Sequence, residues 1–166
     1  MALDAALACR SISARDDHAI AAVIRDVMTE HGCSGPGFSI HDPEVAAMSA
    51  AYQSHESRYV VVEHLGEVVG GGGFARLPGS ALAEATCELR TMYFRSVARG
   101  RGLGAELLQH LRRAMREAGY RRCYLETTTP MHAAQKLYRR ADFAERCGSM
   151  SNTGHHGCDR FFHREL

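Results

Sequence analysis

The chain is 166 residues long, the usual size of a single domain that buries a sizeable core. Its 45% apolar and 23% charged content is that of a soluble globular protein, and no apolar run approaches the roughly 20 residues that span a bilayer. The formal net charge of +1 argues against nucleic-acid binding, so we expect one domain over residues 1–166 and neither nucleic-acid nor membrane partners.

Two further features indicate a cytoplasmic location. Residues 1–17 carry an early acid and no apolar core of signal-peptide length. The six cysteines are scattered without a CxxC pair, which favours free, buried thiols over a disulfide framework.

The first part of the chain predicts one strand and two helices. A strand is expected over residues 8–13 and a helix over about residues 17–31, with an aspartate cap and apolar residues at three- and four-residue steps. The glycines and proline of residues 32–37 predict a loop. A second helix is expected over residues 42–52, because its opening Asp-Pro pair supplies a cap and a first helical residue.

Residues 59–63 and 68–77 predict two strands joined by a tight turn at residues 65–67. The second strand contains four consecutive glycines, at residues 70–73. A glycine run can cradle a phosphate, but this one leads into Phe-Ala-Arg-Leu and not into a helix. We therefore predict a bulge or close backbone packing at these glycines.

The central stretch is a strand, a glycine-rich turn and a long helix. Residues 87–94 suit a strand, residues 99–104 read Arg-Gly-Arg-Gly-Leu-Gly, and residues 103–118 repeat apolar side chains on one helical face. Glycines at such a turn let the backbone approach a ligand, and the first N–H groups of the helix lack internal partners. The stretch therefore predicts a phosphate or pyrophosphate site.

The last part of the chain predicts a strand over residues 121–128, a helix over 131–140 and strands over 143–149 and 159–164. A strand, a crossover helix and a further strand require a parallel pair at the centre of a sheet. The earlier hairpin and the final two strands add antiparallel flanks. The sequence thus indicates an α/β fold with a twisted mixed sheet of about six or seven strands and helices on both faces.

The pattern Arg99-x-x-Gly102-x-Gly104 resembles the acyl-CoA pyrophosphate signature, Gln/Arg-x-x-Gly-x-Gly/Ala, of the GNAT superfamily of N-acetyltransferases. The preceding Glu-Leu-x-x-Met-Tyr-Phe strand has the spacing of that superfamily. The later Ala-x-x-Leu-Tyr segment, which ends at Tyr138, resembles its next helix. The resemblance covers about residues 58–146 and implies the GNAT fold and an acetyl-CoA-dependent N-acetyltransferase.

The resemblance also implies a site for acetyl-CoA, the acyl donor. The backbone N–H of Met92 would polarise the thioester carbonyl, and the backbone of Phe94 would pair with the pantetheine arm. The pyrophosphate would bind the backbone of the turn, with extra positive charge from its two arginine side chains. The turn residues are Arg99, Gly100, Arg101, Gly102, Leu103 and Gly104.

Two side chains are the catalytic candidates that the resemblance implies. Glu88 would be the general base that takes a proton from the acceptor amine; alternatively, it is a strand glutamate in an ion pair with Arg90. Tyr138 would protonate the leaving thiolate; alternatively, it is a core tyrosine on an apolar helix face.

Two positions depart from the family pattern. Met131 stands where many members have an asparagine that hydrogen-bonds the pantetheine, and a thioether cannot replace that amide. Thr128 or Thr129 would then make the contact. Asp142 replaces a glycine, which tolerates a left-handed helix end better, so this helix is expected to end differently.

Candidates for the acceptor side come from both ends of the chain. The two N-terminal helices and their loop cover that side in the family, and here they offer His41, Asp42, Tyr52, His55 and Glu56. Three interpretations are open for the loop near the C-terminus: an ordinary surface loop, a substrate-facing loop or a metal site. The loop contains His155, His156, Cys158 and Asp159. Their spacing matches no closed zinc pattern, so we expect no metal.

The sequence therefore predicts transfer of an acetyl group from acetyl-CoA to a primary amine, of a small molecule or an amino acid, by direct attack in a ternary complex. The alternatives are a protein N-acetyltransferase, a non-catalytic acyl-CoA sensor and a nucleic-acid-binding protein that uses clustered arginines. The presence of both Glu88 and Tyr138 argues against the sensor, and the near-zero net charge argues against the nucleic-acid binder. Dimers are common in the family, so a homodimer is expected by analogy.

Overall fold

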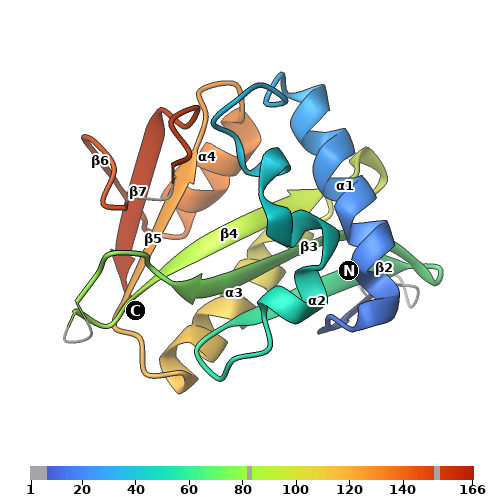
Figure 1. Ribbon diagram of the computed structural model, residues 1–166, viewed down its shortest axis with the longest axis horizontal. Coiled ribbons are helices and arrows are strands. Elements are labelled where there is room, and N and C mark those ends of the chain that lie inside the picture. The colour runs from blue at the N-terminus through green and yellow to red at the C-terminus, as the bar shows by residue number, and fades with distance from the viewer. Residues whose placement is uncertain (1–6, 82–83, 152–153) are drawn as a thin grey trace.

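A computed structural model of the chain describes residues 7–81, 84–151 and 154–166. Its elements form one twisted sheet with helices packed on both faces, as Figure 1 shows. Among the residues that the structure describes, every helix is too short or too polar to cross a lipid bilayer.

The sheet has seven strands in the order β1-β2-β3-β4-β5-β7-β6. Their bounds are β1 Leu7–Ser11, β2 Arg58–His64, β3 Glu67–Arg76, β4 Thr86–Phe94, β5 Arg122–Thr127, β6 Ala144–Arg146 and β7 Arg160–Glu165. Neighbouring strands are antiparallel except β4 and β5, which are parallel. The predicted mixed sheet is confirmed, with α3 (Leu103–Glu117) as the crossover between its two parallel strands.

The helices cover both faces of the sheet. α1 (Asp17–Glu30) and α2 (Met48–Ala51) pack on one face, and α3 and α4 (His132–Arg140) pack on the other. Each fully buried aliphatic side chain contributes roughly 1.5–3 kcal/mol to folding, so its apolar face holds α3 firmly on the sheet. The side chains of α3 with 1% exposure or less are Leu107, Leu108, Leu111 and Met115.

The glycines of β3 let an aromatic ring lie flat across the strand. Cβ atoms on Gly71 and Gly73 would lie 2.8 and 2.5 Å from the Tyr59 ring, closer than real Cβ atoms come. The ring of this β2 residue therefore crosses β3, and its hydroxyl donates to the Thr91 carbonyl oxygen of β4 at 2.9 Å. The close packing predicted from the glycine run is confirmed.

β4 breaks register with β3 at Thr91 and Met92. The register shifts between Gly71 and Gly73 of β3, and the two β4 residues stand opposite the single glycine between them. Thr91 has a φ of 47°, a left-handed conformation that is strained for a β-branched residue. The hydrogen bond from Tyr59 therefore holds a strained bulge in place.

β4 also separates from its parallel neighbour. Only Thr86–Glu88 pair with Arg122–Tyr124 of β5, although the two strands have nine and six residues. Beyond Glu88 the two strands diverge, as Figure 1 shows. The bulge takes Thr91 and Met92 out of the ladder with β3, and the divergence leaves the second half of β4 unpaired with β5.

The helix predicted over residues 42–52 is two short pieces, a 3₁₀ turn at Pro43–Ala46 and α2. Ala47 separates them, with a φ of −147° and a ψ of 52°. Val45 and Met48, on either side of it, are 1% and 0% exposed. Burying both side chains against the core requires a change of backbone direction between them. The Asp-Pro capping signal in the sequence carries no information about this tertiary packing.

The region after α4 is less regular than predicted. The strand expected over residues 143–149 is reduced to β6, and Gly148 takes a left-handed φ of 79° shortly after it. Asp142 has a φ of 60°, so the aspartate adopts the left-handed conformation that a glycine would take there. The expectation of a different helix end at this position is therefore wrong.

All six cysteines are free thiols, as predicted. Cys33, Cys87 and Cys123 are buried, but Cys9 and Cys147 are exposed, so the expectation of buried thiols holds for part of the set. The two exposed thiols, Cys9 and Cys147, will react with any thiol reagent and contribute a background signal in thiol assays.

We expect Gly73→Ala to lower the free energy of unfolding by about 1–3 kcal/mol, because the new methyl group displaces the Tyr59 ring from β3. Gly35→Ala is the control, since a Cβ there meets no described atom within 4 Å and should change stability by less than about 0.5 kcal/mol. Urea denaturation measures both changes. Equal stability of the two variants would contradict the ring-on-glycine packing.

Candidate functional site

The glycine-rich turn joins the end of β4 to α3. Gly100 and Gly102 have φ values of 74° and 81°, which residues with side chains rarely adopt. α3 is 15 residues long and begins directly after Gly102. Within the described ranges, the N–H groups of Gly102, Leu103 and Gly104 donate to no backbone carbonyl. The turn therefore presents unpaired donors at the positive end of a helix dipole, which suits an anion.

The Arg99 side chain is engaged by the protein. Its Nε donates to the Phe94 carbonyl oxygen at 2.7 Å, and its guanidinium forms hydrogen bonds of 2.6 and 2.8 Å with the Glu30 carboxylate. These contacts fasten the start of the turn to the end of β4 and to the last residue of α1. A contribution of the Arg99 charge to anion binding, as the sequence predicted, requires the pair with Glu30 to open.

A pocket of about 410 Å³, here called the turn pocket, lies beside the turn along the end of β4 and one side of α4. Most of its wall is apolar, so it suits an extended ligand arm whose anionic end reaches the turn. It gathers seven of the predicted contact residues: Met92, Phe94, Arg99, Gly100, Gly102, Leu103 and Gly104. Arg101 and Thr128 are not among its lining residues.

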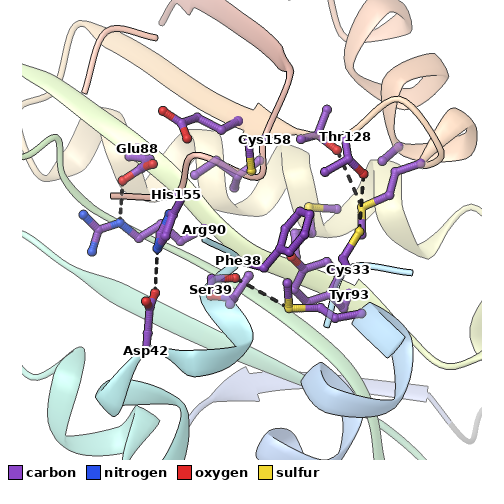
Figure 2. Close-up of a pocket in the computed structure, with 18 of the residues that line it drawn as sticks. Cys33, Phe38, Ser39, Asp42, Glu88, Arg90, Tyr93, Thr128, His155 and Cys158 are labelled. Atoms are coloured by element: carbon purple, nitrogen blue, oxygen red, sulfur yellow. Dashed lines mark hydrogen bonds and ion pairs between the residues drawn. The ribbon is translucent and has the colours of Figure 1, made fainter. Parts of the chain in front are cut away.

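A second pocket of about 70 Å³, here called the inner pocket, lies where β4 and β5 diverge. Figure 2 shows that side chains of β4 and β5 meet side chains from two loops in it. The polar residues and cysteines of its wall are Cys33, Ser39, Asp42, Glu44, Glu88, Arg90, Thr91, Tyr93, Glu126, Thr127, Thr128, Tyr138, His155 and Cys158.

The two pockets meet at a common wall. Both are lined by Met92, Tyr93, Met131, Ala134 and Tyr138. Met92 belongs to the bulge, so its backbone lies outside the regular pairing of β3 and β4. A group at the end of the turn pocket therefore faces a bulged backbone on one side and a phenol on the other.

Tyr138 combines a core position with an unused hydroxyl. The residue is 6% exposed, and its ring packs against Phe143 and Phe162 with centroid separations of 5.9 Å. Its hydroxyl forms no hydrogen bond with another residue of the described chain. Burial raises the pKa of Tyr138, so the phenol stays protonated near neutral pH and can donate its proton to a strong base.

Glu88 is the last residue of β4 that pairs with β5, and it is 3% exposed. Arg90 Nε donates to its Oε2 atom at 2.7 Å, so the ion pair named in the alternative interpretation exists. Burial raises the pKa of Glu88, and the neighbouring Arg90 charge opposes that rise. A carboxylate with a raised pKa exchanges protons closer to neutral pH, so the ion pair is compatible with a base at this position.

The side chains of Glu126 and His155 converge on Glu88. One ligand atom each from Glu88, Glu126 and His155 lie within 4.8 Å of one another. His155 Nε2 lies 2.8 Å from Asp42 Oδ2, which joins the loop before β7 to the segment before α2, as Figure 2 shows. Two carboxylates and an imidazole could hold a cation there. Sequence spacing did not foresee this grouping when it gave no metal pattern.

Thr128 lies on the inner-pocket side. Its hydroxyl is 3.5 Å from the Cys33 thiol, and its carbonyl oxygen accepts a hydrogen bond from Gln135. The Thr129 hydroxyl and N–H both donate to Asp159, at 2.7 and 2.8 Å. Neither threonine is therefore placed toward the turn pocket, where the predicted replacement for the family asparagine would be needed.

The acceptor candidates divide between pocket and surroundings. Among the N-terminal candidates, Asp42 lines the inner pocket, whereas the other four do not: His41, Tyr52, His55 and Glu56. His155 and Cys158 also line it, so the loop near the C-terminus faces the pocket. This placement favours the substrate-facing interpretation of that loop.

Sequence reasoning missed Glu44 and Glu126 as pocket residues. Strand alternation places Glu126 on the same face of β5 as Tyr124, but alternation alone does not give the register of β5 against β4. In the structure Tyr124 of β5 pairs with Glu88 of β4. Glu126 lies two residues after Tyr124, so its carboxylate is on the same face of the sheet as that of Glu88. Strand alternation, combined with the predicted parallel pairing of these two strands, is the signal that could have identified Glu126 as a pocket residue.

Residues 20–143 match the model of the Acetyltransferase (GNAT) family. The chain is 40% identical over 158 residues to YjgM of Escherichia coli (strain K12), described as an uncharacterized N-acetyltransferase, covering 95% of this chain and 93% of that protein. A GNAT-family acetyltransferase of Staphylococcus aureus Mu50 has a TM-score of 0.82 at 18% identity over 97% of this chain and 99% of that one. The structure of yncA from Salmonella typhimurium, which contains acetyl-CoA, has a TM-score of 0.76 at 20% identity over 97% and 94%.

We expect the contact between His155 and Asp42 to weaken as pH rises. The hydrogen bond to Asp42 raises the pKa of His155, and Glu88 and Glu126 act in the same direction. The contact is thus fully stabilising below the unfolded-state pKa of about 6.5 and is lost as pH rises through the higher folded-state pKa. Asp42→Asn should lower the pKa of His155 in an NMR titration.

The same contact has a signature in stability. The loss of unfolding free energy on Asp42→Asn should be larger at about pH 5.5 than at about pH 9. Asp159→Asn is the control, because its carboxylate bonds Thr129 and not a histidine. An equal loss for Asp42→Asn at both pH values would show that the imidazolium does not take part.

Proposed function

The chain belongs to the GNAT family of acetyltransferases, and we propose that it moves the acetyl group of acetyl-CoA to a primary amine of a small molecule or an amino acid, by direct attack in a ternary complex. It is an acetyl-CoA-dependent acetyltransferase, as its family is. The observation that carries the proposal is the meeting of the two pockets at Met92 and Tyr138.

The residues of the turn pocket fit acetyl-CoA. The pyrophosphate would bind the N–H groups at the start of α3, where the left-handed glycines keep side chains out of the way. The apolar wall formed by Phe94 and Leu137 would hold the pantetheine arm. Acetyl-CoA supplies an acetyl group activated as a thioester. The bulged N–H of Met92 would donate to the thioester oxygen, where negative charge develops.

Glu88 and Tyr138 would handle the protons. Glu88 takes a proton from the ammonium form of the acceptor, which frees the nitrogen lone pair for attack on the carbonyl carbon. As the C–N bond forms and the C–S bond breaks, the Tyr138 hydroxyl gives its proton to sulfur. The nitrogen loses two protons in all; one is balanced by the new thiol and the other goes to solvent. The raised pKa values of both groups suit these directions of transfer.

A small acceptor is favoured over a lysine within a protein chain. Gly157 N–H donates to the Gly37 carbonyl oxygen at 3.1 Å, and His155 contacts Asp42 at 2.8 Å. These contacts join the two loops that border the inner pocket, so they narrow the approach that a polypeptide would need. A cytoplasmic location and a homodimer stay predictions from the sequence and the family resemblance.

An acyl-CoA sensor without turnover is the second candidate. It would need the turn pocket but not a buried carboxylate and an unused phenol beside it. Glu88 and Tyr138 therefore support the enzyme, because burying them has a cost that binding alone would not require.

We expect Gly102→Ala to weaken acetyl-CoA binding by about tenfold or more, because the new side chain strains the left-handed residue that opens α3. Gly79→Ala is a matched control, since Gly79 has nearly the same φ, 79°, and lies outside the turn pocket. Both variants should lose similar stability. Calorimetric titration that finds equal acetyl-CoA affinity in both would contradict binding at the turn.

We expect Tyr138→Phe and Glu88→Gln each to lower kcat by about 10²–10⁴-fold, the usual contribution of general acid–base catalysis. Thiol release from acetyl-CoA measures turnover, with a no-acceptor control for the exposed Cys9 and Cys147. In the wild type kcat/KM should rise with pH through the raised pKa of Glu88, and Glu88→Gln should remove that limb. Unchanged rates in both variants would refute the assigned proton transfers.

A further inference from the structure

The inner pocket carries more negative than positive charge. Its wall contains the carboxylates of Asp42, Glu44, Glu88 and Glu126, against the guanidinium of Arg90 and the imidazole of His155. Both cationic groups are already used, because Arg90 bonds Glu88 at 2.7 Å and His155 bonds Asp42 at 2.8 Å. Glu44 and Glu126 form no ion pair with any residue that the structure describes.

Glu126 is held in place by neutral groups. Its Oε1 atom accepts hydrogen bonds from the Tyr124 hydroxyl at 2.8 Å and from the hydroxyls of Ser149 and Ser151, each at 2.7 Å. Hydroxyl donors orient a carboxylate without cancelling its charge. The second oxygen of Glu126 has no hydrogen-bond donor within the described chain. This carboxylate is therefore fixed, charged and open to a ligand in a pocket that also contains Glu88.

The reaction itself separates the roles of the two neighbouring carboxylates. The nitrogen that attacks the thioester must first give up a proton, so it becomes neutral and no longer balances a carboxylate. Glu88 is neutralised by that proton, whereas Glu126 takes no part in the proton transfer. A different cation is needed to balance Glu126, because Glu126 forms no ion pair with a described residue and the nearby His155 already contacts Asp42.

We propose, as an extension of the acetyl transfer proposed above, that the acceptor is an unbranched aliphatic amine with a second cationic nitrogen, and that Glu126 binds that nitrogen. A diamine or linear polyamine has this chemistry. An α- or ω-amino acid instead brings a carboxylate into a pocket that already has a surplus of them. The pocket volume of about 70 Å³ favours a chain over a ring system.

Three acceptors of equal length test the charge requirement. 1,4-Diaminobutane, butylamine and 4-aminobutanoate share the reactive amine and differ at the far end, which is cationic, apolar or anionic. We expect kcat/KM to fall in that order, by about tenfold or more at each step. The wild-type protein alone gives this result, so it does not depend on the folding of any variant.

A variant then assigns the recognition to Glu126. Glu126→Gln should raise KM for 1,4-diaminobutane by about tenfold or more, with a small change in kcat and little change for butylamine. Glu67→Gln, at an exposed β3 position remote from the inner pocket, is the matched control and should leave all three acceptors unchanged. A higher salt concentration should reduce the wild-type preference for 1,4-diaminobutane over butylamine. It should leave the ratio of the two rates in Glu126→Gln unchanged.

The outcomes separate the two proposals. If 4-aminobutanoate is used as well as the diamine, or if Glu126→Gln keeps the full preference for the diamine, the charge recognition is refuted while acetyl transfer to amines stands. If none of these amines raises thiol release above the no-acceptor rate, although acetyl-CoA binds in calorimetry, this acceptor class is overturned. Acetyl transfer to amines fails as well if amino acids, aminoglycosides and arylalkylamines are also inert.

Discussion

The hydrogen bond from Tyr59 to the Thr91 carbonyl oxygen spans three strands of the sheet. It can form because β3 presents glycines and no side chains beneath the Tyr59 ring. The bond fixes a bulge at a strained threonine, and the bulge turns the Met92 backbone out of the β3–β4 ladder. On its other edge β4 leaves β5 after Glu88. The two pockets form around this bulge and the β4 edge that faces away from β3, so the site depends on an irregularity that the core holds in place.

Electrostatics divides the site into two halves. The turn pocket ends at the N-terminus of α3, where unpaired N–H groups favour an anion. The inner pocket has a surplus of carboxylates, of which Glu88 is almost completely buried. Burial raises the pKa of Glu88, while the hydroxyls around Glu126 orient that carboxylate without neutralising it. An anionic donor and a cationic acceptor would thus approach the common wall at Met92 and Tyr138 from opposite sides.

The Arg99 side chain shows how one residue can fit a motif and still have another role. The signature places an arginine at the start of the turn, but its guanidinium contacts Glu30 at the end of α1 and the Phe94 carbonyl oxygen. The pair fastens the turn to the helix that covers the opposite face of the sheet. Exposed ion pairs contribute little to stability, so the main effect of this pair is on geometry. A motif match identified the segment, and tertiary packing decided what its side chain does.

The sequence by itself determined the parts of this protein that depend on local spacing. The glycine turn, the amphipathic α3, the parallel pair and the packing glycines of β3 follow from periodicity and from steric limits on the backbone. The inner pocket was decided by tertiary structure. Glu88, Glu126, His155 and Asp42 are far apart in the chain and meet through the register of β5 on β4 and the path of two loops. The break of the second helix at Ala47 has the same origin, because two buried neighbours outweighed a favourable cap. Short-range signals cannot report register or loop contacts, since these are fixed by the collective burial of side chains from distant segments.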